Sequence, residues 1–333
     1  MAPQRPGDGR KAVLIACCDL MNPCRKNGNT CDRIRSAAAL SNIRTTGHTS
    51  FNLTLNELAS DTDALQFDLA MRVFVITGAG VSLESGIPTF RGKDGYWRNL
   101  NPAKLATPEA FARDPGLVWQ WYRERRQGIR SAQPNPAHQA IAKLAQHARE
   151  FLLVTQNVDD LHPRAGSPKE KMVQIHGDIF VTRCSRCDFQ FRDTGRGGSP
   201  EPPAPLPAER GRLESIASTS SGEREEEDID LPRCPRCSVL MRPGVVWFGE
   251  QLPWDELRRV ENYLEAGPCD FVIVAGTTAT FGYIIDWALR ARANDGKLIE
   301  VNPEETPLSQ FATQQVRESA AMALPRIVDQ LIT

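Results

Sequence analysis

Hydrophobic residues gather into four short runs beyond residue 72, and each run ends in small or polar residues. The runs are Val73–Thr77, Phe151–Thr155, Phe271–Ala275 and Lys297–Val301. Largely apolar runs of this length, separated by helical stretches, are typical of strands buried on both faces of a parallel sheet. The pattern predicts an α/β fold with a Rossmann-like parallel sheet. Its ligand site is expected at the carboxyl ends of the strands.

Helices are expected between the first two of these runs. Thr107 precedes Pro108, which is the preferred order of an N-cap residue and a first helical residue. A second helix is predicted over residues 116–130, where apolar residues recur at helical spacing. A third helix should follow Pro136 for the same reason.

Two segments lack the apolar content of a packed core. Residues 191–230 are rich in Gly, Pro, Ser and acidic residues, so we expect a largely disordered loop there. Over residues 1–60, Lys and Arg outnumber Asp and Glu by 8 to 4. We therefore interpret residues 1–62 as an N-terminal extension that is disordered or presequence-like. This interpretation favours a mitochondrial location, with the cytoplasm and the nucleus as alternatives.

Composition narrows the function classes. The 333 residues include 40 Lys and Arg against 41 Asp and Glu, and the hydrophobic fraction is 41%. That fraction excludes wholesale disorder, and no apolar run approaches the roughly 20 residues that a membrane helix requires. The near-neutral charge argues against a dedicated nucleic-acid binder. We expect no direct nucleic-acid partner and no membrane partner, and a monomeric protein.

Two Cys-x-x-Cys pairs flank the 191–230 loop. They are Cys184 with Cys187 and Cys234 with Cys237. Four thiolates at this spacing suit a tetrahedral zinc ion, and an all-thiolate site leaves no open position for catalysis. The long intervening segment is tolerable because loop-closure entropy grows slowly with loop length. The sequence therefore predicts one structural zinc ion.

A glycine-rich turn follows the first apolar run, at residues 78–86. Glycines allow a backbone to approach a pyrophosphate closely, although such a turn alone is weak evidence for a dinucleotide site. No acidic residue closes a second strand about 20 residues later, as a dehydrogenase fingerprint requires. Chemistry other than hydride transfer is indicated.

These motifs together resemble the sirtuin family in order and spacing, over about four-fifths of the chain. The resemblance is carried by residues 78–92, 156–159, 176–177, 246–250 and 276–278 together with the two cysteine pairs. It implies an extension at 1–62 and a catalytic domain at 63–333. The Rossmann-like part would comprise 63–92, 136–177 and 244–333, with a helical insert at 93–135 and a zinc module at 178–243.

The resemblance also implies the chemistry. Sirtuins use NAD⁺ as cosubstrate to remove acyl groups from lysine side chains of proteins, releasing nicotinamide and 2′-O-acyl-ADP-ribose. His176 matches the family's general base, and an imidazole suits proton transfer at neutral pH; Asn157 and Asp159 match its catalytic partners. The implied NAD⁺ contacts are Gly78, Ala79, Gly80, Ser82, Glu84, Ser85, Thr89, Phe90, Arg91, Trp97, Gln156, Asn157, Asp159, Gly276, Thr277, Thr278, Asn302, Pro303, Glu304 and Ala320.

A finer resemblance is to the sirtuins that remove malonyl, succinyl and glutaryl groups. Tyr122 and Arg125 share one helix face at i and i+3, so a phenol and a guanidinium can converge on one carboxylate. Ala106 matches a small residue that leaves room for the acyl chain. The substrate backbone is expected to pair with the segment containing Val246, Gly249 and Glu250.

The sequence leaves alternatives open and shows one departure from the family. The same site could support deacetylation or mono-ADP-ribosyl transfer, and a non-catalytic NAD-sensing protein ranks below both. Phe281-Gly282-Tyr283 stands where a Tyr-Pro element is common in sirtuins. The packing near the adenosine half of the cofactor is therefore left open.

Overall fold

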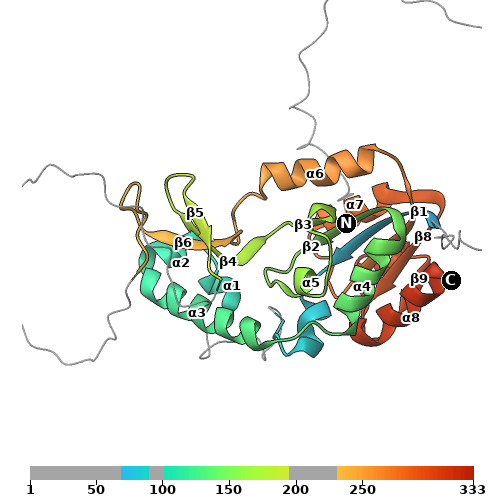
Figure 1. Cartoon of the computed structure of the whole chain (residues 1–333), viewed down its shortest axis with the longest axis horizontal. Coiled ribbons are helices and arrows are strands. Elements are labelled where there is room, and N and C mark those ends of the chain that lie inside the picture. The colour runs from blue at the N-terminus through green and yellow to red at the C-terminus, as the bar shows by residue number, and fades with distance from the viewer. Residues whose placement is uncertain (1–68, 90–100, 195–230) are drawn as a thin grey trace, which may run out of the picture. The chain divides into compact units, whose positions relative to one another are not determined.

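The computed structural model describes residues 69–89, 101–194 and 231–333. A parallel sheet with helices on both faces forms its larger part, which confirms the predicted fold class (Figure 1). In spatial order the strands are β3 (Met172–Gln174), β2 (Ala148–Thr155), β1 (Leu69–Thr77), β7 (Cys269–Ala275), β8 (Arg292–Val301) and β9 (Gln314–Val316).

All four apolar runs lie in strands of this sheet. β1 lies between β2 and β7, and Val73 is in register with both Phe151 and Phe271. Residues 73–77 of β1 are fully buried, because helices cover both faces of the sheet. This two-sided burial explains why the run is continuously apolar instead of alternating with polar residues.

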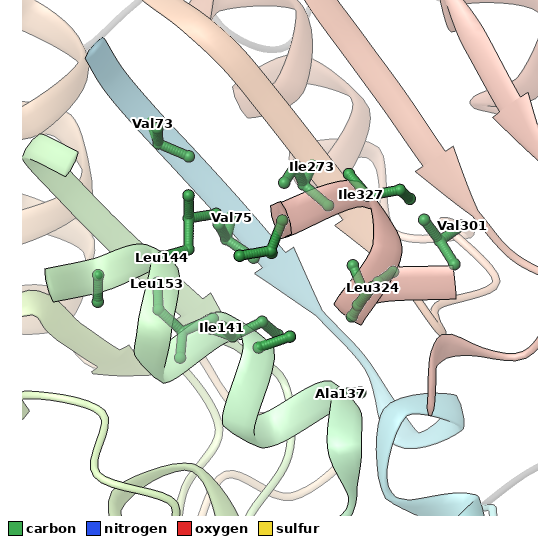
Figure 2. Packing of buried hydrophobic residues seen from close by; sticks show 14 of the residues in the cluster. Val73, Val75, Ala137, Ile141, Leu144, Leu153, Ile273, Val301, Leu324 and Ile327 are labelled. Atoms are coloured by element: carbon green, nitrogen blue, oxygen red, sulfur yellow. The ribbon is translucent and has the colours of Figure 1, made fainter. Parts of the chain in front are cut away.

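Two helical layers enclose the sheet. α4 (Pro136–His147) and α8 (Ala320–Ile332) cover one face, and α6 (Trp254–Glu265) and α7 (Gly282–Ala291) cover the other. Side chains alternate along β1, so Val73 and Val75 pack under α4 and α8 (Figure 2). Phe74 and Ile76 pack on the opposite face. None of the helices in the described ranges is long and apolar enough to cross a bilayer.

The smaller part combines three helices with an antiparallel sheet. The helices are α1 (Pro102–Leu105), α2 (Pro108–Arg113) and α3 (Pro115–Ser131), and the strands, in the order β5-β4-β6, are β5 (Gln190–Arg192), β4 (Gly177–Cys184) and β6 (Met241–Val245). Trp119 and Trp121 of α3 pack with Ile179 of β4 and Val245 of β6 in one apolar cluster. The remaining short elements are η1 (Ala79–Ser85), α5 (Leu161–Arg164), η3 (Lys169–Lys171) and η4 (Ser309–Phe311).

The predicted helix starts are confirmed, and one loop boundary is wrong. Thr107 caps α2 by accepting a hydrogen bond from the Ala110 amide at 3.1 Å. The expected loop does not begin at residue 191, because Phe191 belongs to β5 and pairs with Thr182. The short strand was missed because three residues give too little alternation to detect. The expected N-terminal extension, residues 1–62, lies outside the described residues, as do residues 195–230 of the expected loop.

Candidate active site and zinc site

A cavity of about 620 Å³ lies at the carboxyl ends of β1, β2, β7 and β8, the edge where the sequence predicts a ligand site. It brings together residues that are far apart in the chain. Of the predicted site residues, those lining it are Gly78, Ala79, Gly80, Ser82, Glu84, Thr89, Ala106, Tyr122, Arg125, Gln156, Asn157, Asp159, His176, Val246, Gly249, Glu250, Gly276, Thr277, Thr278, Asn302, Pro303, Glu304 and Ala320.

Four of the predicted NAD⁺ contacts are not among the lining residues. Ser85 lies at the end of η1, where its hydroxyl accepts a hydrogen bond from the Asn135 side chain at 3.0 Å. Asn135 also caps α4, so Ser85 ties η1 to that helix. Phe90, Arg91 and Trp97 lie outside the described residues.

Two glycine turns meet at the floor of the cavity. The Gly80 amide donates to the Gly276 carbonyl at 2.8 Å, and Gly276 has a φ of 60°. A Cβ atom on Gly80 would lie 2.8 Å from the Gly276 Cα, and one on Gly276 would lie 2.7 Å from the Gly80 carbonyl carbon. Only glycine allows this approach, which leaves the main chain open toward the cavity, as the cradle of a pyrophosphate requires.

His176 lies between β3 and β4 and faces the cavity. Its Nδ1 is 3.0 Å from the Gln156 main-chain oxygen, and its Nε2 is 2.9 Å from the Tyr283 hydroxyl. A carbonyl oxygen only accepts, so Nδ1 carries the proton of the neutral ring. Burial lowers the pKa of His176, against the opposing effect of the Gln156 carbonyl. The ring is therefore neutral near pH 7, and Nε2 is the nitrogen that carries the lone pair of a base.

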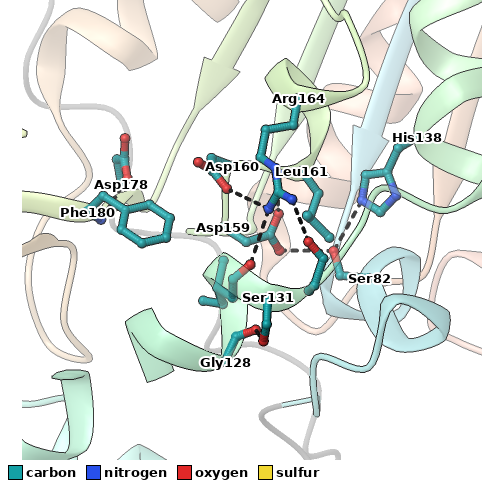
Figure 3. Close-up of polar contacts among 12 residues, drawn as sticks. Ser82, Gly128, Ser131, His138, Asp159, Asp160, Leu161, Arg164, Asp178 and Phe180 are labelled. Atoms are coloured by element: carbon teal, nitrogen blue, oxygen red, sulfur yellow. Dashed lines mark hydrogen bonds and ion pairs between the residues drawn. The ribbon is translucent and has the colours of Figure 1, made fainter. Parts of the chain in front are cut away.

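A buried hydrogen-bond chain lies beneath the cavity (Figure 3). His138 Nδ1 lies 3.3 Å from the Asn135 main-chain nitrogen and 3.0 Å from the Asn135 side-chain oxygen, and His138 Nε2 is 3.3 Å from the Ser82 hydroxyl. Ser82 in turn donates to Asp159 at 2.9 Å and accepts from the Asn157 side chain at 3.1 Å. The chain orients two cavity residues, Asn157 and Asp159, from behind. Burial raises the pKa of Asp159 and lowers the pKa of His138 to about 4.

An arginine holds the end of α3 near the same chain (Figure 3). Arg164 donates to the Ile129 and Ala132 carbonyls at 3.2 and 2.5 Å and pairs with Asp160 at 3.6 Å. These carbonyls lie in the last turn of α3 and just after it, where a helix leaves acceptors unsatisfied. Arg164 thereby links α3, which carries Tyr122 and Arg125, to the segment that carries Asp159.

The part of the cavity wall that includes Tyr122 is built around Trp247. Its indole N–H donates to the Tyr122 hydroxyl at 3.0 Å, and the Arg242 guanidinium lies 3.3 Å above its ring. Glu250 accepts hydrogen bonds from the Trp247 amide at 2.8 Å and from Arg242 at 2.9 Å. The Glu250 carboxylate thus braces the turn that follows β6, although the residue also lines the cavity.

The four predicted cysteines converge at the end of the small sheet. The distances between sulfur atoms are 3.4 Å for Cys184–Cys237, 3.6 Å for Cys187–Cys234 and 3.8 Å for Cys187–Cys237. Tetrahedral zinc with bonds of about 2.3 Å requires sulfur atoms about 3.8 Å apart. The donor set therefore fits one zinc ion, with the four cysteines as its ligands.

Comparison with known proteins identifies the family. A family model described as Sir2 matches residues 78–281, well over half of the chain. The chain is 40% identical to an NAD-dependent protein deacylase of Aquifex aeolicus over 265 residues, which cover 78% of this chain and 95% of the relative. The chain belongs to the Sir2 family. It is also 42% identical to NAD-dependent protein deacylase 1 of Archaeoglobus fulgidus over 253 residues, covering 76% and 90%.

Solved Sir2 structures agree with this assignment. A Sir2 homologue in complex with NAD is 40% identical to this chain, with a TM-score of 0.63, over 82% of this chain and 94% of the other. A mutant Sir2 homologue in complex with 2′-O-acetyl ADP ribose is 39% identical, with a TM-score of 0.64, over 81% and 96%. This sirtuin is an NAD-dependent protein deacylase that acts on acylated lysine.

One expectation from the sequence is wrong. The relatives come from bacteria and archaea, including Aquifex aeolicus and Archaeoglobus fulgidus, which have no mitochondria. The mitochondrial location is therefore not supported for this sirtuin. The error arose because a modest excess of basic residues over 1–60 was interpreted as a targeting signal.

Sequence reasoning missed three groups that the structure places near the site. His138 stands at the third position of α4, a common place for a capping side chain, and its link to Ser82 gave no local signal. Tyr283 and Phe281 line the cavity from the start of α7. Only the departure from the Tyr-Pro element marked that segment as unusual.

Zinc removal provides the first prediction. Cys187→Ser should leave the four-ligand site unable to hold zinc, and the β4–β6 sheet should lose its order because its own apolar cluster is small. We expect zinc content to fall from one ion per chain to near zero, with deacylase activity lost. Metal analysis and hydrogen exchange of residues 177–192 measure this. The control, Cys269→Ala in the parallel sheet, should keep its zinc; a full zinc complement in Cys187→Ser would contradict the assignment.

Proposed function

We propose that this sirtuin removes malonyl, succinyl and glutaryl groups from lysine in preference to acetyl, producing nicotinamide and 2′-O-acyl-ADP-ribose. The observation that carries the proposal is the position of Arg125 and Tyr122 in the cavity wall, next to Trp247. Both come from one face of α3, as their spacing predicted. They offer a charged and a neutral donor toward the same space.

The Arg125 guanidinium is the cationic part of this pair. It lies 5.1 Å from the Trp121 ring centre, and burial lowers its pKa, although nearby Tyr122 and Asp159 oppose the effect. A guanidinium that has lost hydration gains most from a carboxylate ligand, which it can bind through two parallel hydrogen bonds. An acetyl group has no carboxylate to supply, so the site favours a dicarboxylic acyl chain.

Tyr122 supplies the second donor. Its oxygen accepts the Trp247 indole hydrogen, which leaves its own hydroxyl hydrogen to donate elsewhere. Burial raises the pKa of Tyr122 to about 12, so the phenol stays protonated at physiological pH. Ala106 stands on the same side of the cavity, and its small side chain leaves room for the longer acyl group.

The residues that follow β1, β2, β7 and β8 would hold NAD⁺ in the cavity. The glycine turns would receive the pyrophosphate, and Asn302, whose side chain donates to the Thr277 carbonyl at 2.7 Å, would support the adenosine half. NAD⁺ supplies an activated ribose carbon once bound. His176 would accept a ribose hydroxyl proton at Nε2, and the Ser82 chain would hold Asn157 and Asp159 in place.

Paired peptides provide the test and the second prediction. Nicotinamide release is measured with succinyl-lysine and acetyl-lysine versions of one peptide. We expect wild type to prefer the succinyl peptide, and Arg125→Met to lower its kcat/KM by about 10- to 150-fold, the equivalent of one charge-assisted contact. Turnover of the acetyl peptide should change only a few-fold, because that substrate makes no such contact.

A matched control keeps the result interpretable. Arg123→Met, on the exposed side of the same helix, removes an equal charge without changing the cavity wall and should leave the preference unchanged. Equal turnover of the two peptides by wild type would discard the role of Arg125 and leave a sirtuin deacetylase. Nicotinamide release together with ADP-ribosylated protein, but no deacylated peptide, would favour mono-ADP-ribosyl transfer instead.

A further inference from the structure

The Tyr283 hydroxyl is hydrogen-bonded to Nε2 of His176, the ring nitrogen that would act as the base. The hydroxyl lies 2.9 Å from Nε2, while Nδ1 is held by the Gln156 carbonyl. Because Nδ1 carries the ring proton, Nε2 accepts and the phenol donates. Burial raises the pKa of Tyr283, so the phenol keeps its proton across the working pH range.

The phenol ring is held in this position from both sides. Phe281 stacks on it at 5.6 Å and 12°, and Trp287 packs against it at 4.9 Å and 53°. Phe281 also meets the His176 ring edge-on at 6.1 Å. Tyr283 stands in the first turn of α7. The contact with His176 is thus made by a ring that its neighbours hold in place.

We propose that Tyr283 is a positioning residue that caps His176 Nε2 in the free enzyme and gives up this hydrogen bond when the cofactor binds. The proposal rests on the role of His176 as the base. The Nε2 of a neutral imidazole has one lone pair, so it cannot accept the phenol hydrogen and also take a ribose hydroxyl proton. The phenol and the ribose hydroxyl therefore compete for one atom.

Within the described residues, no charged group forms a hydrogen bond with the His176 ring. The bonds of His176 there are those to Gln156 and Tyr283. On the neighbouring strands, Asp178 is paired with Arg192, and Arg242 with Glu250. The charged residues that line the same cavity are Glu84, Arg125, Asp159, Glu250 and Glu304.

A phenol that donates to the lone pair stabilises the neutral imidazole, so it lowers the pKa of His176 while the cap is in place. The effect should exist in the free enzyme and vanish in the cofactor complex. The pH profile of kcat/KM for NAD⁺ reports groups of the free enzyme, whereas that of kcat reports the complex. The two profiles therefore separate a cap from a role in chemistry.

Tyr283→Phe tests the cap, because it removes only the hydroxyl and keeps the stacked ring. We expect the acidic limb of kcat/KM for NAD⁺ to move up by about 0.5–1 pH unit, the equivalent of one neutral hydrogen bond. The acidic limb of kcat should not move. The control is Tyr263→Phe, which removes another partly buried hydroxyl bond, to the Val73 carbonyl at 2.8 Å, and should shift neither limb.

Histidine NMR titration of the free protein provides a readout that needs no turnover. The pKa of His176 should be 0.5–1 unit higher in Tyr283→Phe than in wild type, by about the strength of one hydrogen bond. An unchanged pKa would overturn the proposal, as would a fall in kcat at every pH with neither limb shifted. If His176→Asn keeps its activity, the base assignment fails instead, and the titration still decides whether Tyr283 bonds Nε2.

Discussion

His176→Asn should lower kcat for nicotinamide release and deacylation by about 100- to 10,000-fold, the usual contribution of a general base. The variant keeps a polar side chain of smaller size beside the Gln156 carbonyl but offers no nitrogen lone pair toward the cavity. NAD⁺ affinity should change little, since the glycine turns and the adenosine half are untouched. Steady-state kinetics and isothermal titration calorimetry with NAD⁺ measure the two effects separately.

The pH dependence of the wild type gives this prediction a second measurement. The base works when neutral, and burial lowers the pKa of His176, so kcat/KM should stay on its plateau to a pH below the usual histidine value of about 6.5. His162→Asn is the contrasting substitution. His162 bonds Thr77 at 3.1 Å beneath the sheet edge, so its loss should lower stability more than kcat. Activity of His176→Asn near the wild-type level would remove the base assignment.

Gly276→Ala should raise the dissociation constant for NAD⁺ by more than 100-fold. The added Cβ would meet the Gly80 carbonyl carbon at 2.7 Å and the Val81 main-chain nitrogen. Both are backbone atoms of η1, so they cannot rotate away as a side chain could. The turn must move, and losing two charge-assisted contacts from its amides would cost about 3 kcal/mol. Calorimetry with NAD⁺ measures the loss directly.

Gly166→Ala is the matched control for backbone strain. Gly166 has a φ of 97°, but a Cβ there would meet no atom within 4 Å. That variant should lose about 1 kcal/mol of unfolding free energy from the left-handed conformation and keep its NAD⁺ affinity. An equal, small effect in both variants would show that strain alone, and not the close approach of the two turns, governs position 276.

The elements that could be predicted from the sequence are those whose signal is local. The run at residues 73–77 is apolar at nearly every position because β1 is buried on both faces, and the Thr107-Pro108 start follows from the chemistry of one helix end. The zinc ligands were predictable because a Cys-x-x-Cys pair already sets two donors near each other. The loop at residue 191 was misjudged since a three-residue strand carries almost no periodicity.

By itself, the sequence determined the parallel sheet, the edge that carries the site, the cysteine ligands and the family to which the residues at 78–92 and 176–177 belong. Only the tertiary structure decided which groups meet those residues: Tyr283 on His176, His138 behind Ser82, and Trp247 on Tyr122. These partners lie 56 to 125 positions apart in the chain. Contacts over such separations depend on how whole elements pack, and no spacing within a single helix or strand encodes them.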